Sequence, residues 1–305
     1  MGLGTNQVTV TTAATFIPEV WSDEIVAAYK KNLVAANIIK KMSFKGKKGD
    51  TVHIPAPTRG DASAKAANTQ VTLIAATEGE KTVSIDQHWE YSRLIEDIVE
   101  AQALSSLRQF YTDDAGYALA RKVDSTLIQL GRGVNGGSGT AAYSGAFSGA
   151  DGTTAYVAGA NTGSGALTDA AIRRSIQRLD DSDVPMDGRF LIVPPSTRNT
   201  LMGIARFTEQ AFVGEAGGGN TIRNGEVGNV YGIPVFVTSN ADAATDGDRI
   251  CLLGHKDFAV LVEQMGVRTQ TQYKQEYLGT LFTADVLFGV GELRDGAAIA
   301  LAVPA

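Results

Sequence analysis

Residues 46–91, near the N-terminus, limit the possible folds of this chain more than any other segment of the sequence does. This segment holds three runs of alternating apolar and polar residues, at 51–57, 69–74 and 81–91, and such alternation is typical of half-buried strands. Between the first two runs lies the small, polar segment RGDASAKAAN. We therefore predict a long β-hairpin with a mobile tip. So few large apolar side chains cannot form a core of their own, so the hairpin must pack against something else, and a neighbouring subunit is the simplest candidate.

The residues before the hairpin predict an arm and a helix. Residues 1–21 are rich in Thr and Val without helical period, which indicates an extended arm. A first helix is expected over 22–45, because Ser22 can cap it and apolar residues follow at helical spacing. Lys40 and Lys41 would close this helix, where positive charge matches the negative end of the helix dipole.

After the hairpin the pattern becomes mixed. We expect a short helix at 92–103, a long helix over 106–130, and then an irregular Gly-, Ser-, Ala- and Thr-rich crossing at 131–166. From 168 onward helices and strands alternate. In chain order we predict a helix capped by Thr168, a strand at 190–193, a helix through Met202, a Gly-rich loop at 214–220, a strand at 228–240 interrupted by Gly232 and Pro234, a buried strand at 249–254 and a strand-rich tail. This order predicts an α+β fold.

Charge and cysteine content narrow the function. The chain has 305 residues, with 33 acidic and 27 basic side chains and a net charge of -6, whereas a dedicated nucleic-acid binder is usually basic. The single cysteine, Cys251, excludes an intrachain disulfide and any multi-cysteine zinc site, and we expect it to be a small buried residue. The sequence contains no apolar run long enough to span a membrane, and its first residues lack the pattern of a signal peptide, so we expect neither.

No constellation of residues predicts chemistry. The three histidines lie far apart in the sequence, and GRGVNG at 131–136 follows a helix, whereas a dinucleotide site needs a preceding strand. Aspartates cluster at 180–183 and at 242–248, where solvated turns are favoured over a weak calcium site. We therefore predict that the chain is not an enzyme and that it uses no metal and no cofactor.

Four strings, in this order, resemble the Hong Kong-97-type capsid fold of tailed bacteriophages. FIPEVWSDEIVAAYKKNLVAANII at 16–39 and GDTVHIP at 49–55 are similar to the arm, the first helix and the entry to the extended loop of that family. RFLIVPPSTRNTLM at 189–202 and VGNVYGIPVFVTSN at 227–240 are similar to strands of its axial domain. The resemblance covers nearly the whole chain.

The resemblance implies a division of labour along the chain. It implies an N-terminal arm at 1–21, a first helix at 22–45, an extended loop at 46–91, a peripheral domain at 92–167 with its spine helix at 106–130, an axial domain at 168–255, and a return to the peripheral sheet at 256–305. The implied function is that of a major capsid protein that self-assembles into the icosahedral shell around the double-stranded DNA of a tailed phage.

The same resemblance implies partners and contacts. It implies a homo-oligomer of pentamers and hexamers, together with a separate scaffolding protein, a portal protein and a decoration protein. It also implies non-specific contact with packaged DNA. The protein would be located in the virion capsid, would assemble in the host cytoplasm and would have no membrane partner. Our hypothetical intersubunit contacts are Lys47, Lys48, Arg59, Lys65 and Trp89. Bending around the symmetry axes is expected where glycine makes it easy, in the crossing at 131–166 and at Gly214, Gly217, Gly218 and Gly219.

Three alternatives stay open at this point. An encapsulin-type nanocompartment shell would share the fold and differ in its cargo. An α/β enzyme with its core at 168–255 would need a catalytic constellation that the sequence does not show. A tail-tube subunit would not need the long helix.

Overall fold

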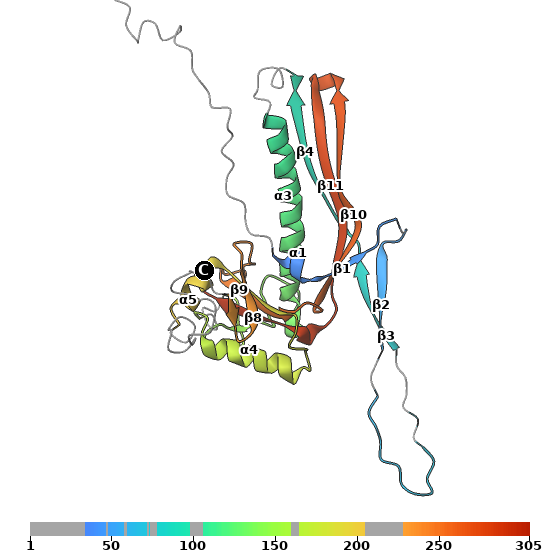
Figure 1. Ribbon diagram of the computed structural model, residues 1–305, viewed down its shortest axis with the longest axis vertical. Coiled ribbons are helices and arrows are strands. Elements are labelled where there is room, and N and C mark those ends of the chain that lie inside the picture. The colour runs from blue at the N-terminus through green and yellow to red at the C-terminus, as the bar shows by residue number, and fades with distance from the viewer. Residues whose placement is uncertain are drawn as a thin grey trace, which may run out of the picture.

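The computed structural model describes residues 34–46, 48–57, 60–71, 73, 78–97, 106–159, 165–204 and 228–305. Figure 1 shows three parts: a long helix with long strands beside it, a compact lobe that contains the C-terminus, and a hairpin that projects from the far side of the long strands. The elongated outline follows from the length of these strands and of the helix, which extend well beyond the lobe.

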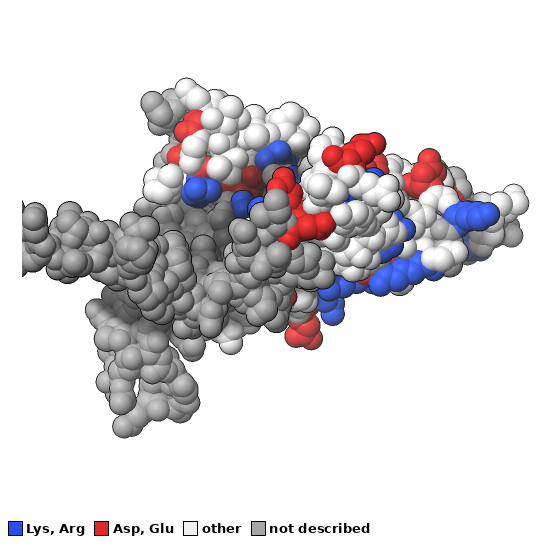
Figure 2. Space-filling view, turned by 90° about the horizontal axis from the view of Figure 1, so that it is seen from above, with Lys and Arg blue, Asp and Glu red and all other residues white. Residues whose placement is uncertain are grey.

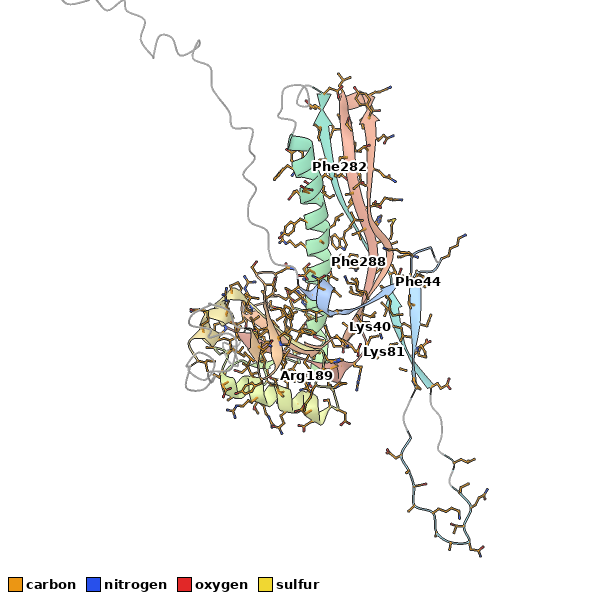
Figure 3. All side chains as sticks on the ribbon, in the orientation of Figure 1. Lys40, Phe44, Lys81, Arg189, Phe282 and Phe288 are labelled. Carbon is orange, nitrogen blue, oxygen red and sulfur yellow. The ribbon has the colours of Figure 1, made fainter. Side chains whose placement is uncertain are left out.

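The long helix α3 (Ser106–Gln129) confirms the rod that the sequence predicts at 106–130. Its length is about 36 Å at 1.5 Å per residue. It lies along a four-stranded sheet of order β1-β10-β11-β4, in which β1 is parallel to β10 and the other pairs are antiparallel. The strands are β1 (Lys40–Ser43), β4 (Gln87–Glu96), β10 (Ala259–Lys274) and β11 (Gly279–Glu292). Leu119 and Leu127 of the helix and Phe288 of β11 (Figure 3) belong to one buried apolar cluster, which holds helix and sheet together.

The compact lobe is built on a six-stranded sheet of order β5-β12-β9-β6-β8-β7. Its strands are β5 (Phe147–Ser148), β6 (Arg189–Val193), β7 (Asn229–Val230), β8 (Ile233–Val237), β9 (Arg249–His255) and β12 (Ala298–Val303), and its helices are α4 (Asp169–Asp181) and α5 (Pro195–Met202). Every residue of β6 and β12 is buried. The Thr168 hydroxyl accepts a hydrogen bond from the N–H of Ala171, which confirms the predicted cap of α4. Short elements complete the fold: α1 (Ala35–Ile38), η2 (Leu130–Arg132), η3 (Val134–Gly136), η4 (Gln275–Tyr277) and η5 (Asp295–Ala297).

The hairpin has a base that packs on its own subunit and a tip that does not. Strands β2 (Thr51–Pro57) and β3 (Glu78–Ser84) pair antiparallel along their whole length. Val83 and Ile85 form a small buried cluster with Val260 and Val262 of β10. The base of the hairpin is therefore supported by β10 of the same chain, and not by the neighbouring subunit that we considered the simplest candidate. In the tip, Val71 and Leu73 are 59% and 87% exposed.

Two predicted helices are strands at one end. Within the first, predicted over 22–45, residues 22–33 lie outside the described residues and Ala35–Ile38 is helical as α1. The helix does not extend to residue 45, because Lys40–Ser43 forms β1 and pairs with Val260–Glu263 of β10. The predicted helix at 92–103 is wrong at its start, since β4 continues to Glu96 along β11. In both cases an available sheet edge overrides helical periodicity. The described residues of the middle run, 69–71 and 73, form no strand.

The tail of the chain divides between the two sheets. We expected all of 256–305 to return to the peripheral sheet, and β10 and β11 do join the sheet beside α3. The last strand, β12, instead pairs with β9 in the lobe, from Ala298 opposite Gly254 to Val303 opposite Arg249. An entirely apolar strand needs cover on both faces, and the lobe supplies it.

The glycine-rich crossing is packed and does not form an open loop. Tyr143 and Tyr156 are each at most 3% exposed. A Cβ atom at Gly145 would lie 2.2 Å from the Val134 carbonyl oxygen, and one at Gly137 would lie 2.3 Å from that of Arg132. Glycine is required here because backbone segments approach each other closely. In its described part, the crossing is thus not the bending element that we expected.

Candidate assembly surfaces

A buried carboxylate joins three parts of the chain at the centre of the subunit. Asp124, on α3, has no exposed surface. Its Oδ1 accepts hydrogen bonds from the N–H groups of Val34 at 3.0 Å and Ala35 at 2.7 Å, at the start of α1. Its Oδ2 accepts one from the Asn240 side-chain amide of the lobe at 2.9 Å. One side chain therefore caps α1 and fixes the long helix to the lobe.

Further aspartates hold the glycine-rich crossing against the lobe. Asp242 accepts hydrogen bonds from the Arg132 guanidinium and from the Tyr143 hydroxyl, the latter at 2.6 Å. Burial, reinforced by the Asp242 charge, raises the pKa of Tyr143. Asp246 accepts hydrogen bonds from the Tyr156 hydroxyl and from the N–H of Gly159. The aspartates at 242–248 are thus structural partners of the crossing.

Asp180, at the end of α4, has a similar role. Arg189 is 4% exposed (Figure 3) and bonds the Asp180 carboxylate and the backbone oxygens of Val184 and Pro185. The buried cation is therefore fully engaged by its own lobe, and Asp180 balances its charge. Within the described residues, no three His, Cys, Asp or Glu side chains converge as metal ligands would.

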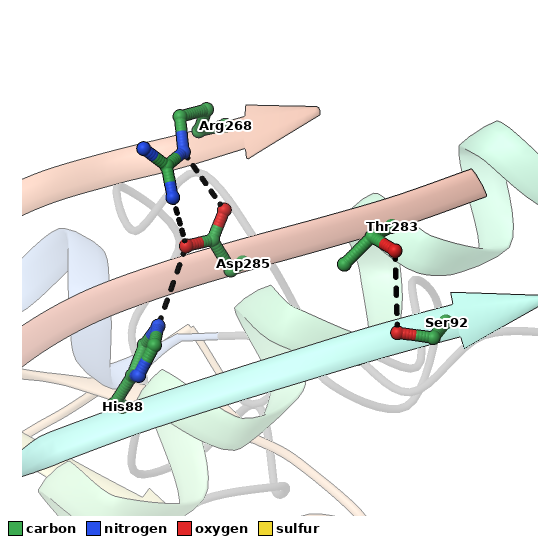
Figure 4. A network of polar contacts seen from close by, with 5 residues as sticks. All are labelled: His88, Ser92, Arg268, Thr283 and Asp285. Atoms are coloured by element: carbon green, nitrogen blue, oxygen red, sulfur yellow. Dashed lines mark hydrogen bonds and ion pairs between the residues drawn. The ribbon is translucent and has the colours of Figure 1, made fainter. Parts of the chain in front are cut away.

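A polar network crosses the open face of the four-stranded sheet. Asp285 of β11 bonds the Arg268 guanidinium of β10 twice, at 3.1 and 2.8 Å, and the ring of His88 of β4 at 3.3 Å (Figure 4). Hydrogen bonding to Arg268 holds the pKa of Asp285 below its usual range. Ser92 and Thr283 make a further contact between β4 and β11. The network joins three strands and leaves His88 and Arg268 largely exposed.

The structure describes three of the residues that we expected to contact a neighbouring subunit. Lys48 is exposed in the turn before β2. Lys65 lies at the exposed tip, where its Nζ donates to the adjacent Ala66 carbonyl at 3.4 Å. The Trp89 ring has Lys122 Nζ at 4.0 Å from its centroid, so part of its surface serves the subunit itself. Lys47, Arg59 and the four glycines at 214 and 217–219 lie outside the described residues.

The remaining candidates for chemistry are structural. Cys251 is buried, as predicted, and burial raises the pKa of its thiol to about 12. His255 accepts a hydrogen bond from the Asp257 N–H, so its other ring nitrogen donates to the Asp187 carbonyl at 2.8 Å. Among the described helices, none combines the length and apolar character that a bilayer crossing requires. Among the described residues on the face in Figure 2, acidic and basic side chains both occur and neither sign covers a large area.

An elongated subunit with a spine helix, a projecting hairpin and a compact lobe has the α+β fold of Hong Kong-97-type capsid proteins. A structure of Mycobacterium phage Che8 is 23% identical with a TM-score of 0.74, and covers 94% of this chain and 97% of its own. The capsid structure of cyanophage P-SCSP1u is 21% identical with a TM-score of 0.75, and covers 99% of this chain and 97% of its own. The capsid of a native GTA particle is 12% identical with a TM-score of 0.67, over 99% of this chain and 100% of its own.

The chain belongs to the phage capsid protein family, whose profile matches residues 89–301. No curated protein matches it. The family is structural and not enzymatic, in agreement with the missing catalytic constellation, and it excludes the α/β enzyme. The protein is thus a component of a phage capsid, where it works as a homo-oligomer.

Proposed function

We propose that this chain is the major capsid protein of a tailed bacteriophage and that its pentamers and hexamers form an icosahedral shell around double-stranded DNA. The observation that carries the proposal is the two-part hairpin: Val83 and Ile85 anchor its base in the subunit, while Val71 and Leu73 expose apolar surface at its tip. Covering exposed apolar surface by a second copy stabilises the assembly by about 25 cal/mol per Å² of that surface. The tip is therefore the element that holds the adjacent copy.

Weak contacts that are repeated many times suit such a shell. Each contact loses part of its apolar gain to the ordering of side chains and of whole subunits, so misplaced copies can dissociate before the shell closes. Within 46–91 the hairpin of β2 and β3 acts as the extended loop, whereas Gln87–Tyr91 already belong to β4 of the sheet beside α3. Residues 92–167 act as the peripheral domain, apart from β5, which pairs with β12, and 168–255 act as the axial domain. Strand β12 completes the axial domain, and β10 and β11 complete the peripheral one.

The proposal includes partners of the shell. A separate scaffolding protein guides assembly, a portal protein occupies one vertex, and a decoration protein binds from outside. Contact with packaged DNA is non-specific, because phosphate contacts carry no sequence information. It is also weak, because the chain carries a net charge of -6. Assembly takes place in the host cytoplasm.

Two groups of residues are assigned to assembly within this proposal. Lys47 and Lys48 contact an acidic surface of the next copy, so changing both to Glu lowers the salt sensitivity of shell stability. The loop from Gly214 to Asn220 adapts to five- and six-fold surroundings, so a proline there gives aberrant particles. Normal shells from either variant would remove that residue group from the account.

Shortening the hairpin tests the proposal. Pro57 pairs with Glu78, so residues 58–77 can be replaced by an Asn-Gly turn that closes the two strands. The shortened subunit keeps the anchored base, and we expect it to fold with the wild-type unfolding midpoint but to form no shells in electron micrographs and sedimentation. A Leu73→Ser variant should show the same defect in weaker form. If wild-type protein stays monomeric under all assembly conditions, or if the shortened chain assembles normally, the proposal fails.

A further inference from the structure

One arginine of the lobe differs from the others in its surroundings. Arg132, Arg189 and Arg268 each bond a carboxylate of the same chain. Within the part of the chain that the structure describes, Arg178, in the last turn of α4, makes no ion pair, and its Nε is the one buried side-chain nitrogen or oxygen without a hydrogen-bond partner. A buried N–H that has lost its water and gained no acceptor destabilises the isolated subunit.

This guanidinium borders a cavity of about 210 Å³ between α4, η3, β5 and the start of β12. The Phe147 ring covers it from one side, with 3.6 Å between the Arg178 Cζ and the ring centroid. Apart from Ile299, the rest of the lining is polar or small. It consists of Asn135, Asp181, Ser182, Gly296, Ala298 and Ile299. The cation is thus held in place by a ring and faces an open polar cavity.

The charged groups nearby do not neutralise it. Asp181 lines the same cavity, but no ion pair joins it to Arg178. Burial and the neighbouring Arg174 charge lower the pKa of Arg178, while Asp151 acts weakly in the opposite direction. Asp151 is itself engaged by Thr153 and Thr154. A guanidinium in these surroundings gains most from an added anion.

We propose that the Arg178 cavity is an intersubunit site that receives a carboxylate side chain, Asp or Glu, from a second copy of this chain. This inference rests on the proposed shell. The fork of N–H groups on a guanidinium matches the two oxygens of a carboxylate. Copies of this chain offer an excess of such groups, since each carries 33 acidic and 27 basic side chains.

A phosphate of packaged DNA fits this cavity less well. Phosphate-binding surfaces usually gather several cations, whereas Arg178 is the one Lys or Arg that lines this cavity and Asp181 adds a negative charge. A single fixed guanidinium with amide and hydroxyl neighbours suits one carboxylate.

The test compares Arg178→Gln and Arg178→Lys with the matched control Arg174→Gln, which removes the same charge from an exposed position on the same helix. Two quantities are measured: the unfolding midpoint of dissociated subunits and the concentration of free subunit in equilibrium with shells. We expect the unfolding midpoint of Arg178→Gln to stay close to that of wild type, because removal of an unpaired donor offsets the loss of the contact with the Phe147 ring. Its free-subunit concentration should rise about tenfold, Arg178→Lys should lie between, and Arg174→Gln should stay within about twofold.

Several outcomes would overturn the inference. Unchanged assembly by Arg178→Gln would do so, and equal destabilisation of subunit and shell would assign Arg178 a role inside its own chain. A defect confined to DNA-filled particles, with normal empty shells, would identify phosphate as the occupant. If wild-type protein forms no shells, the proposed function itself fails and this inference with it. A density map of the shell should show a neighbouring carboxylate in the cavity, at hydrogen-bond distance from the Arg178 guanidinium.

Discussion

Replacing Asp124 by alanine should destabilise the subunit more than almost any other single polar substitution. The carboxylate is fully buried and receives hydrogen bonds from the N–H groups of Val34 and Ala35 and from the amide of Asn240. Alanine would leave these donors without an acceptor in a place that water does not reach, and it would leave α1 without its cap.

The magnitude follows from these contacts. A hydrogen bond to a charged group contributes about 1.5–3 kcal/mol, and the contributions overlap because all the donors share one carboxylate. Alanine regains about 0.5 kcal/mol through its higher helix propensity within α3. We therefore expect Asp124→Ala to lower the free energy of unfolding by about 4 kcal/mol. Asp124→Asn should lower it by about 1–2 kcal/mol, since its oxygen can still accept from α1 and Asn240 can rotate to present its own oxygen.

Urea unfolding of dissociated subunits measures both effects, because the midpoint shifts with stability while the slope reports the exposed surface. Asp61→Ala, on the exposed tip, is the control and should stay within about 0.5 kcal/mol of wild type. An Asp124→Ala variant within about 1 kcal/mol of wild type, at an unchanged slope, would refute the reasoning.

Three further predictions address packing, reactivity and pH. Gly145→Ala should lower the free energy of unfolding by about 2–4 kcal/mol, because the added Cβ would overlap the Val134 carbonyl. Gly228→Ala, with open space around it, should change this free energy little. Equal unfolding midpoints of the two variants would contradict the packing described for the crossing. Cys251 should stay unlabelled by a thiol reagent at pH 8 until urea unfolds the chain, because burial raises its pKa to about 12, and rapid labelling of native protein would be the opposite result. Asp285→Asn should be less stable than wild type at pH 7. The difference should vanish as the pH falls below the ordinary aspartate pKa of about 3.9 and on through the lowered pKa of Asp285, because protonation of Asp285 ends its stabilisation by Arg268 in wild type. A pH-independent difference would argue against this ion pair.

The elements that the sequence predicts best are those whose own residues decide them. Apolar spacing and length suffice for α3, and a continuous apolar run suffices for β6. The Thr168 cap and the buried Cys251 follow from side-chain chemistry within a few residues. These features depend little on what lies far away in the chain, so local pattern is enough.

The errors occur where a distant segment decides the outcome. Lys40–Ser43 forms a strand because β10 offers it an edge more than 200 residues away in sequence, and β4 continues to Glu96 because β11 runs beside it. The glycines of the crossing looked like a flexible loop, whereas Gly145 serves a close backbone approach that no local pattern reveals. The role of Asp124 was likewise hidden, since its partners are 88 residues or more away along the chain.

The assembly residues show the same division. Alternating residues at 81–91 did predict that Val83 and Ile85 face a core, but not that the core belongs to the same subunit. Arg178 was missed altogether, because an unpaired cation is recognised only when the carboxylates of the folded chain are seen to bond other groups.

Hydrogen exchange at the hairpin, measured on dissociated subunits and on shells, tests the central claim most directly. The account predicts that amides of the β3 base, such as that of Val83, are protected in both states, while those of the tip at 60–71 exchange freely in the subunit and become protected in the shell. Tip amides that exchange equally fast in both states, or a base that is unprotected in the free subunit, would contradict it.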